Sequence, residues 1–255
     1  MSFSDFHVHT VYCDGKNTPE EIILSAIKMK MERLGFSGHS YTHFDESYCM
    51  SVEGTEEYKK EILGLKEKYK DVIKIYLGIE KDVFSLYDTS DFDYVIGSSH
   101  YLRFGEEYVP IDENAQTFKE CVGKHYDGDY IHMAKDYFEN ITKVIDLGAD
   151  MVGHLDIITK YNRNNNLFDE SDPRYLEYAK RAIDKILKAG IPFEVNTGAI
   201  GRGHKDFPYP SDELLKYIIR NGGKVVLSSD SHSASTLCYQ FEKWQDYVTR
   251  LRKEC

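Results

Sequence analysis

The sequence predicts an α/β fold, a single-domain barrel of the TIM type. Helical stretches alternate with short β-rich runs along the whole chain, as in parallel sheets whose strands are joined by crossover helices. The length of 255 residues suits one α/β barrel. Residues that commonly bind metals follow six of the seven predicted strands. We therefore expect one active-site face at the carboxyl ends of the strands.

Seven β-rich runs are predicted to form the strands. They lie near Phe3–Val8, Leu34–Gly38, Ile73–Ile79, Tyr94–Ser98, Asp150–Gly153, Pro192–Val195 and Lys224–Ser228. The intervening helices carry recognisable start and stop signals: a capping box at Thr18, an N-cap at Asp172 before Pro173, an N-cap at Ser211, and glycines at Gly190 and Gly222. The stretch between Ser171 and Gly190 places its apolar residues on one helical face, as expected of a helix that wraps a barrel.

One connection is longer than the others and runs from Tyr101 to about Tyr130. We expect it to be a lid or an insertion over one face of the barrel. No Pro-, Gly- or Ser-rich linker divides the chain, so residues 1–255 are predicted to form one domain with an insertion around 101–130.

The composition excludes some partners. Forty-three acidic residues against 32 Lys and Arg give a net charge of −11, which repels nucleic acids and anionic membranes at long range. Five scattered cysteines and the lack of a long apolar run favour a reduced, unanchored, cytoplasmic protein. A phosphate-bearing substrate would need a local positive centre. The oligomeric state is left open.

The strand ends carry the candidate ligands. In chain order these are His7 and His9, His39, Glu80, His100, His154, and the pair Asp230 and His232. In the first strand, His7 and His9 are two residues apart and share one face. A single histidine after a strand is commonly structural, and an acid there is commonly a helix cap or an ion-pair partner. Because six strand ends share this property on one barrel face, we predict a metal cluster.

Other polar residues keep two interpretations open. His43 and His204 follow strands two and six and either line the pocket or lie on the surface. Arg163 and Arg202 lie in loops after strands five and six, where a guanidinium either binds phosphate oxygens or is solvated. Glu194 is either a hydrogen-bonded buried acid or a pocket residue. Surface or core roles are expected for His125 and His132.

The set His7-x-His9-Thr10, the GHS after strand two, Glu80, His100, His154 and Ser229-Asp230-Ser231-His232 resembles the polymerase and histidinol phosphatase family over essentially the whole chain. The GHLDII, EVNTG and PYPS segments are most similar to the stand-alone L-histidinol-phosphate phosphatases of histidine biosynthesis. The resemblance implies a distorted (β/α)7 barrel that holds three divalent ions, Mn, Fe or Zn. It also implies a ligand set of His7, His9, Glu80 and Asp230 for one ion; Glu80, His100 and His154 for a second; and Asp14, His39 and His232 for a third. Several relatives have a histidine at the place of Asp14, and the Asp14 carboxylate of this chain makes the third site harder.

We therefore expect a metal-dependent phosphomonoester hydrolase in which a metal-bridging hydroxide attacks phosphorus in line. Asp14, Glu80, Asp230 and His232 are the expected catalytic residues, with His204 a candidate general acid. The expected substrate contacts are Arg163, Arg202, His43, Asp45 and Glu113. Two alternatives stay open: a phosphoesterase of the same family acting on another small phosphate or on nucleic-acid ends, and a metal-binding barrel without turnover.

Overall fold

The computed structural model describes residues 3–254 and contains one seven-stranded parallel sheet. Its strands follow one another in chain order: β1 (Ser4–Asp5), β2 (Arg33–Phe36), β3 (Lys74–Asp82), β4 (Tyr94–Ser98), β7 (Met151–Val152), β8 (Phe193–Asn196) and β9 (Val225–Ser228). Each strand therefore pairs with its neighbour in sequence through a crossover connection, as the sequence predicts. All seven predicted strands are present.

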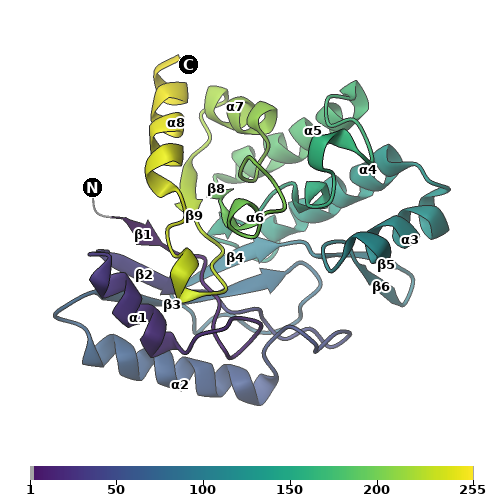
Figure 1. Cartoon of the computed structure of the whole chain (residues 1–255). Coiled ribbons are helices and arrows are strands. Elements are labelled where there is room, and N and C mark those ends of the chain that lie inside the picture. The colour runs from purple at the N-terminus through teal and green to yellow at the C-terminus, as the bar shows by residue number, and fades with distance from the viewer. Residues whose placement is uncertain (1–2, 255) are drawn as a thin grey trace.

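The sheet curls into a nearly closed barrel (Figure 1). The two outer strands are joined just beyond their ends by a parallel bridge between Val8 and Ser231. There the His9 amide donates to the Ser231 carbonyl at 2.8 Å, and the Ser231 amide donates to the His7 carbonyl at 3.1 Å. This closure confirms the predicted TIM-like α/β barrel and brings the first and last strand ends together.

The strand bounds correct one expectation about Glu80. It was predicted to follow the third strand, but β3 continues to Asp82, so Glu80 lies inside it. The extension is held from both sides, because the Glu80 amide donates to Gly38 O at 3.1 Å and Asp82 pairs with Ser98 in β4. β1, in contrast, is shorter than predicted.

The helices surround the sheet. They are α1 (Pro19–Lys28), α2 (Val52–Lys68), α3 (Ala115–Tyr126), α4 (Tyr130–Ile141), α5 (Pro173–Ala189), α6 (Gly198–Gly201), α7 (Asp212–Arg220) and α8 (Phe241–Glu254), with 3-10 turns η1 (Thr142–Ile145), η2 (Ile157–Thr159), η3 (Arg163–Asn165) and η4 (Ala234–Thr236). α1 packs beside α2, and α4 beside α5 (Figure 1). Helices on the outer face leave the carboxyl ends of the strands free for a site.

The predicted helix ends are largely confirmed. Thr18 and Glu21 form the capping box of α1, and the Asp172 side chain accepts from the first turn of α5. Gly190 ends α5 in the left-handed conformation at a φ of 75°, which glycine adopts without steric cost. Ser211 stands at the N-cap of α7, but its side chain makes no capping hydrogen bond.

The long connection after β4 has its own secondary structure. It forms the antiparallel hairpin β5 (Tyr101–Phe104) and β6 (Glu107–Pro110), followed by α3. Phe44, from the loop after β2, stacks on Tyr108 of the hairpin with ring centroids 3.9 Å apart. The hairpin is thereby packed against the loop after β2.

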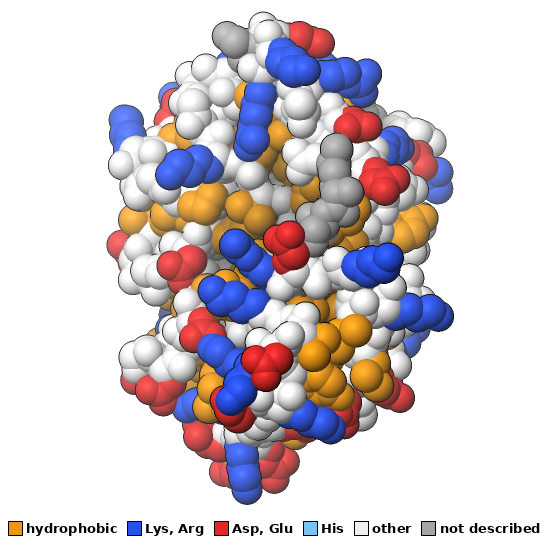
Figure 2. Space-filling view, turned by 90° about the vertical axis from the view of Figure 1, so that its left-hand side faces the viewer, with side chains coloured by type: hydrophobic (Ala, Val, Ile, Leu, Met, Phe, Trp, Pro, Cys, Tyr) orange, Lys and Arg blue, Asp and Glu red, His pale blue; other side chains and the backbone are white. Residues whose placement is uncertain are grey.

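The surface carries both signs of charge. On the face that Figure 2 shows, Lys and Arg side chains are interspersed with Asp and Glu and with small apolar groups. On this face the charged side chains therefore form no continuous patch of one sign. Among residues 3–254, no helix combines the length and apolar character needed to cross a bilayer.

Tyr94 ties three strands together at the start of β4. Its hydroxyl donates to Phe6 O at 2.6 Å and Phe36 O at 3.0 Å. The ring lies directly over Gly78 of β3, where an added Cβ would come within 2.1 Å of the ring carbon Cζ. Only glycine leaves room for this ring, so the barrel depends on the pair Gly78 and Tyr94.

We expect Gly78→Ala to lower the free energy of unfolding by about 1–3 kcal/mol, the usual cost of overpacking a core. The matched control is Gly64→Ala on the exposed side of α2, where an added Cβ meets nothing within 4 Å. This control should stabilise the protein by about 0.5–1 kcal/mol, because alanine favours helix over glycine. Urea unfolding of both variants measures the difference; equal stabilities would show that Tyr94 can move aside.

Candidate metal centre

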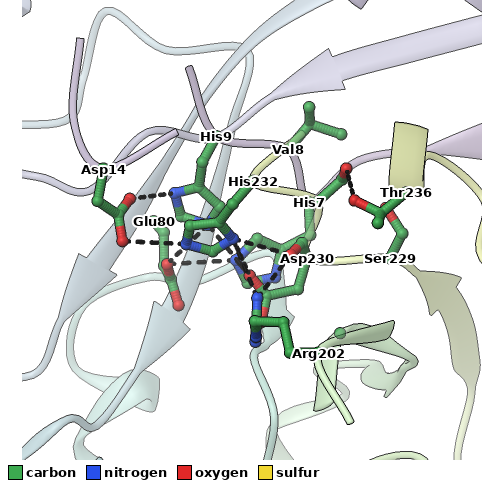
Figure 3. A network of polar contacts seen from close by, with 12 residues as sticks. His7, Val8, His9, Asp14, Glu80, Arg202, Ser229, Asp230, His232 and Thr236 are labelled. Carbon is green, nitrogen blue, oxygen red and sulfur yellow. Dashed lines mark hydrogen bonds and ion pairs between the residues drawn. The ribbon is translucent and has the colours of Figure 1, made fainter. Parts of the chain in front are cut away.

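The nine residues expected to bind metals all meet at one end of the barrel. Figure 3 shows His7, His9, Asp14, Glu80, Asp230 and His232 among them. They come from the ends of β1, β2, β4, β7 and β9, from inside β3, and from the loop that holds Asp14. All except Asp14 and His232 are buried. Residues up to 225 positions apart in sequence thus form one polar cluster in the barrel mouth.

His7 and His9 converge as the strand geometry predicts. His7 Nε2 lies 3.2 Å from Glu80 Oε2, and His9 Nε2 lies 3.3 Å from Asp230 Oδ1. Burial, together with the nearby His232 and His39, lowers the pKa of His9 to about 3. Its imidazole is therefore neutral, which is the form that binds metals.

Glu80 occupies the middle of the cluster. Its Oε2 lies 3.0 Å from His39 Nδ1, and its Oε1 lies 2.9 Å from His154 Nε2. The Ser98 hydroxyl also donates to Oε1 at 2.6 Å. Burial alone would raise the pKa of this carboxyl, but the surrounding histidines, His7 first, hold it well below its usual range. Glu80 is thus an ionised carboxylate with both oxygens facing imidazoles.

His100 and His154 form a second part of the cluster, with their Nε2 atoms 3.2 Å apart. Asp82, two residues after Glu80, fixes His100, because its Oδ2 accepts the His100 amide at 2.7 Å and lies 3.3 Å from Nδ1. Gly153 keeps the space open, since a Cβ there would lie 2.3 Å from Ser98 Oγ.

Asp14 lies in a third part of the cluster, beside His232 and His39. Its Oδ2 lies 3.0 Å from His232 Nε2, and its Oδ1 lies 3.7 Å from His39 Nε2. Burial favours protonation, but His39 and His232 lower the pKa of Asp14. The His232 ring also stacks on His9 at 4.1 Å between centroids, which places Asp14, His232 and His9 side by side (Figure 3).

The Asp230 carboxylate contacts an arginine as well as histidines. Arg202 Nη2 donates to Asp230 Oδ2 at 2.9 Å, and Nη1 donates to the Asp230 carbonyl at 3.0 Å. Although burial works against it, the Asp230 charge raises the pKa of Arg202. The backbone of Asp230 is left-handed, with a φ of 48°, a conformation that aspartate tolerates better than most residues.

The donor set fits divalent cations. Within residues 3–254, four groups of three or four His, Asp or Glu residues place their ligand atoms within 4.8 Å of one another, and every one of the nine residues belongs to at least one group. His7 Nε2, His9 Nε2 and Glu80 Oε2 are buried without a hydrogen-bond partner. A cation between these three facing ligand atoms would supply the missing partner for each of them.

The groups match the expected ligand sets only in part. Asp14, His39 and His232 cluster as expected, with His9 added, and His7, His9 and Asp230 cluster without Glu80. Glu80 instead groups with His7 and His154, and separately with His39 and His100. The nine residues are therefore brought together, while the division among individual ions stays a proposal.

A cavity of about 290 Å³ opens beside the cluster. Among the expected substrate contacts, Arg202, Asp45 and Glu113 line it. Its wall also contains Asp112 and Lys160, which sequence reasoning missed. Lys160 Nζ lies 3.2 Å from Asp112 Oδ2, so these two form an ion pair in the wall.

Three expected site residues are not among those lining this cavity. Arg163 is exposed and pairs with Asp206, with Nη2 2.8 Å from Oδ1. His43 packs its ring against Phe44 and Tyr108. His204 lies edge-on to Tyr161 at 5.9 Å, and burial lowers its pKa. In this structure the direct pocket contacts are thus fewer than the sequence predicts.

Glu194, left open by the sequence, is buried beneath the cluster. Its Oε1 lies 2.6 Å from His7 Nδ1, and its Oε2 accepts the His154 amide at 3.0 Å. The period-two alternation of β8 places Glu194 and Asn196 on one face. That signal could have marked the pair as facing the site, though not which ligand they contact.

Comparison with known families identifies the chain. The PHP domain family matches residues 5–198. The chain belongs to this family. The histidinol-phosphatase of Bacillus subtilis is 26% identical over 267 residues, an alignment that covers 95% of this chain and 98% of that protein. The family assignment agrees with the resemblance carried by the histidine motifs.

Solved structures show the same fold. A Listeria monocytogenes protein assigned as a histidinol phosphatase superimposes with a TM-score of 0.81 at 20% identity, covering 95% of this chain and 100% of that chain. The histidinol phosphate phosphatase of Lactococcus lactis, solved with zinc, L-histidinol and phosphate, gives 0.74 at 22% identity, covering 97% and 93%. The barrel of this PHP chain is therefore shared along nearly its whole length.

We expect Glu80→Gln to lose at least one bound metal ion per chain, because a neutral amide is a poorer ligand than a carboxylate for closely spaced cations. Elemental analysis of the variant after metal loading and desalting measures this loss. Glu61→Gln on α2, an isosteric change at a carboxylate bound to Tyr12, is the control and should keep the wild-type content. A full metal complement in Glu80→Gln would contradict the central position of Glu80.

Proposed function

We propose that this PHP chain is a metal-dependent phosphomonoester hydrolase whose substrate is L-histidinol phosphate. The observation that carries the proposal is the cluster of nine ligand-type residues beside a cavity that also holds Arg202 and carboxylates. The name of the Bacillus subtilis relative and the L-histidinol and phosphate bound to the Lactococcus lactis protein support the choice of substrate.

The proposed centre holds three divalent ions, Mn, Fe or Zn. His7, His9, Glu80 and Asp230 would bind the first ion, and Glu80, His100 and His154 the second. Asp14, His39 and His232 would bind the third. When bound, such ions lower the pKa of water and neutralise phosphoryl oxygens, the two requirements for hydrolysing a phosphate monoester.

The residues around the cavity carry charges opposite to those of the substrate groups that they would contact. The Arg202 guanidinium at the edge of the cluster is placed to pair with the phosphate dianion. Asp45 and Glu113 line the same cavity and would meet the ammonium and imidazole groups of histidinol. Asp45 is held in place, since its Oδ2 accepts the Tyr101 hydroxyl at 2.7 Å and its Oδ1 accepts Ser47 Oγ at 2.6 Å.

We also propose that residues 1–255 act as one PHP-type domain, with the segment around 101–130 as an insertion. The hairpin in that segment forms a separate two-stranded sheet, which supports this division. A cytoplasmic location is proposed because all four cysteines within residues 3–254 are free thiols; Cys255 lies outside the described residues.

Removal of metal should abolish activity. We expect a chelator to stop phosphate release from L-histidinol phosphate, and Mn, Fe, Co or Zn to restore it. The assay compares this substrate with simple alkyl phosphates and p-nitrophenyl phosphate. Full activity in demetallated protein would overturn the metal dependence. Equal rates on alkyl phosphates would leave only a general phosphoesterase, and metal-loaded protein without any turnover would favour a binding barrel.

Variants of the cavity residues should distinguish contacts with the phosphate from contacts with the organic part of the substrate. We expect Asp45→Asn and Glu113→Gln to lower kcat/KM on L-histidinol phosphate roughly 10- to 100-fold, as for the loss of a charged hydrogen bond, and to change p-nitrophenyl phosphate hydrolysis little. Arg202→Ala should impair both substrates, because the phosphate is common to them.

Arg163→Ala is the matched control for Arg202→Ala, since this arginine pairs with Asp206 outside the cavity lining. It should leave both rates near the wild-type values. If Arg163→Ala costs as much as Arg202→Ala, the loop that carries it moves onto the substrate. Equal losses on both substrates in Asp45→Asn and Glu113→Gln would contradict their proposed part in recognition.

A further inference from the structure

The EVNTG segment at the end of β8 contains a series of hydrogen bonds. In each of them, chemistry fixes which group donates and which accepts. The Gly198 amide donates to Asn196 Oδ1 at 2.9 Å. A backbone amide cannot accept a hydrogen bond, so this contact orients the Asn196 side chain with its NH₂ group on the other side. That group donates to Glu194 Oε2 at 3.0 Å.

Glu194 connects this series of hydrogen bonds to the metal centre. Its Oε2 accepts both Asn196 Nδ2 and the His154 amide, each at 3.0 Å, while its Oε1 lies 2.6 Å from His7 Nδ1. Glu194 is 1% exposed. An ionised carboxylate only accepts hydrogen bonds, so His7 Nδ1 carries a hydrogen and donates it. An imidazole that binds a metal is neutral, so in the metal-bound form the lone pair of His7 would lie on Nε2, which faces Glu80 and Asp230.

We propose that Glu194 is the positioning residue that sets the metal-binding tautomer of His7 and connects it to the loop of His154. This inference rests on the proposed metal centre and adds a residue outside its ligand set. Carboxylates behind ligating histidines act in this way generally, and their loss typically weakens metal binding by about 10- to 100-fold. Here one carboxylate contacts residues assigned to two different ions.

Glu194→Gln tests the proposal with a change of one atom. The His154 amide and Asn196 Nδ2 both donate to Glu194 Oε2. In the variant, the atom at this position must therefore be the amide oxygen of the glutamine. The introduced amide is therefore held with its NH₂ group toward His7 Nδ1, where it donates. His7 must then accept at Nδ1 and carry its hydrogen on Nε2, so that this nitrogen no longer binds a cation.

The experiment follows zinc and the His7 ring separately from activity. Zinc binding is measured by titration and by elemental analysis, and ¹⁵N NMR of the zinc-loaded protein reports which ring nitrogen of His7 is protonated. We expect wild type to carry a hydrogen on Nδ1. Glu194→Gln should bind zinc roughly 10- to 100-fold more weakly and carry no hydrogen on Nδ1.

Asp5→Asn is the matched control. Asp5 is a fully buried carboxylate in β1 that accepts the His7 amide at 3.4 Å and the Ser229 amide at 3.1 Å, without touching the His7 ring. It measures the general effect of removing a buried charge next to His7. We expect it to lower Tm while retaining the Nδ1 hydrogen and the wild-type zinc content.

The outcomes separate this inference from the proposed function. Wild-type zinc affinity with a persistent Nδ1 hydrogen in Glu194→Gln would overturn the role of Glu194 and leave the function intact. If that variant does not fold, zinc-loaded wild type without a hydrogen on His7 Nδ1 would overturn it instead. Zinc binding and tautomer as expected, without phosphate release from L-histidinol phosphate, would reject the proposed function alone. A wild-type chain that takes up no zinc would overturn both.

Discussion

The buried carboxylate of Glu80 is the constraint on which the site depends. An ion of this kind in the protein interior costs several kcal/mol unless opposite charges and hydrogen bonds surround it. Glu80 is 1% exposed, and its partners, His7, His39, His100 and His154, come from four other strand ends. Compensating this charge therefore requires the barrel to close correctly, and the bridge between Val8 and Ser231 completes the closure beside His7.

Much of this arrangement could be predicted because it depends on periodicity and strand order. Parallel strands in chain order place all strand ends on one face, so the positions of His7, His39, His100, His154 and Asp230 followed from the sequence alone. The placement of Glu80 just past the third strand was wrong because strand length depends on pairing with neighbours on both sides. No local signal records that pairing.

The remaining details depend on loop geometry and on contacts between distant residues. Arg163 and Arg202 have similar sequence contexts, but α6 turns Arg202 back toward Asp230, whereas η3 turns Arg163 toward Asp206. The contact between Glu194 and His7 joins residues 187 positions apart. Alternation in β8 indicated a face for Glu194, but only the closed barrel identifies the imidazole behind which it lies.

The proposed recognition of the organic part of the substrate would depend on packing between two segments outside the barrel sheet. Tyr101, in the hairpin after β4, donates to Asp45 in the loop after β2, and stacking of Phe44 on Tyr108 holds the same two segments together. Aromatic contacts of this kind contribute about 0.5–1.5 kcal/mol beyond burial. The aromatic residues Phe44 and Tyr108 therefore act indirectly, by keeping a carboxylate at the cavity wall. Because the net charge of −11 disfavours phosphate, the proposed binding of a phosphate ester in this cavity would depend on Arg202 and the metal centre, while Asp45 and Glu113 would favour a cationic leaving group.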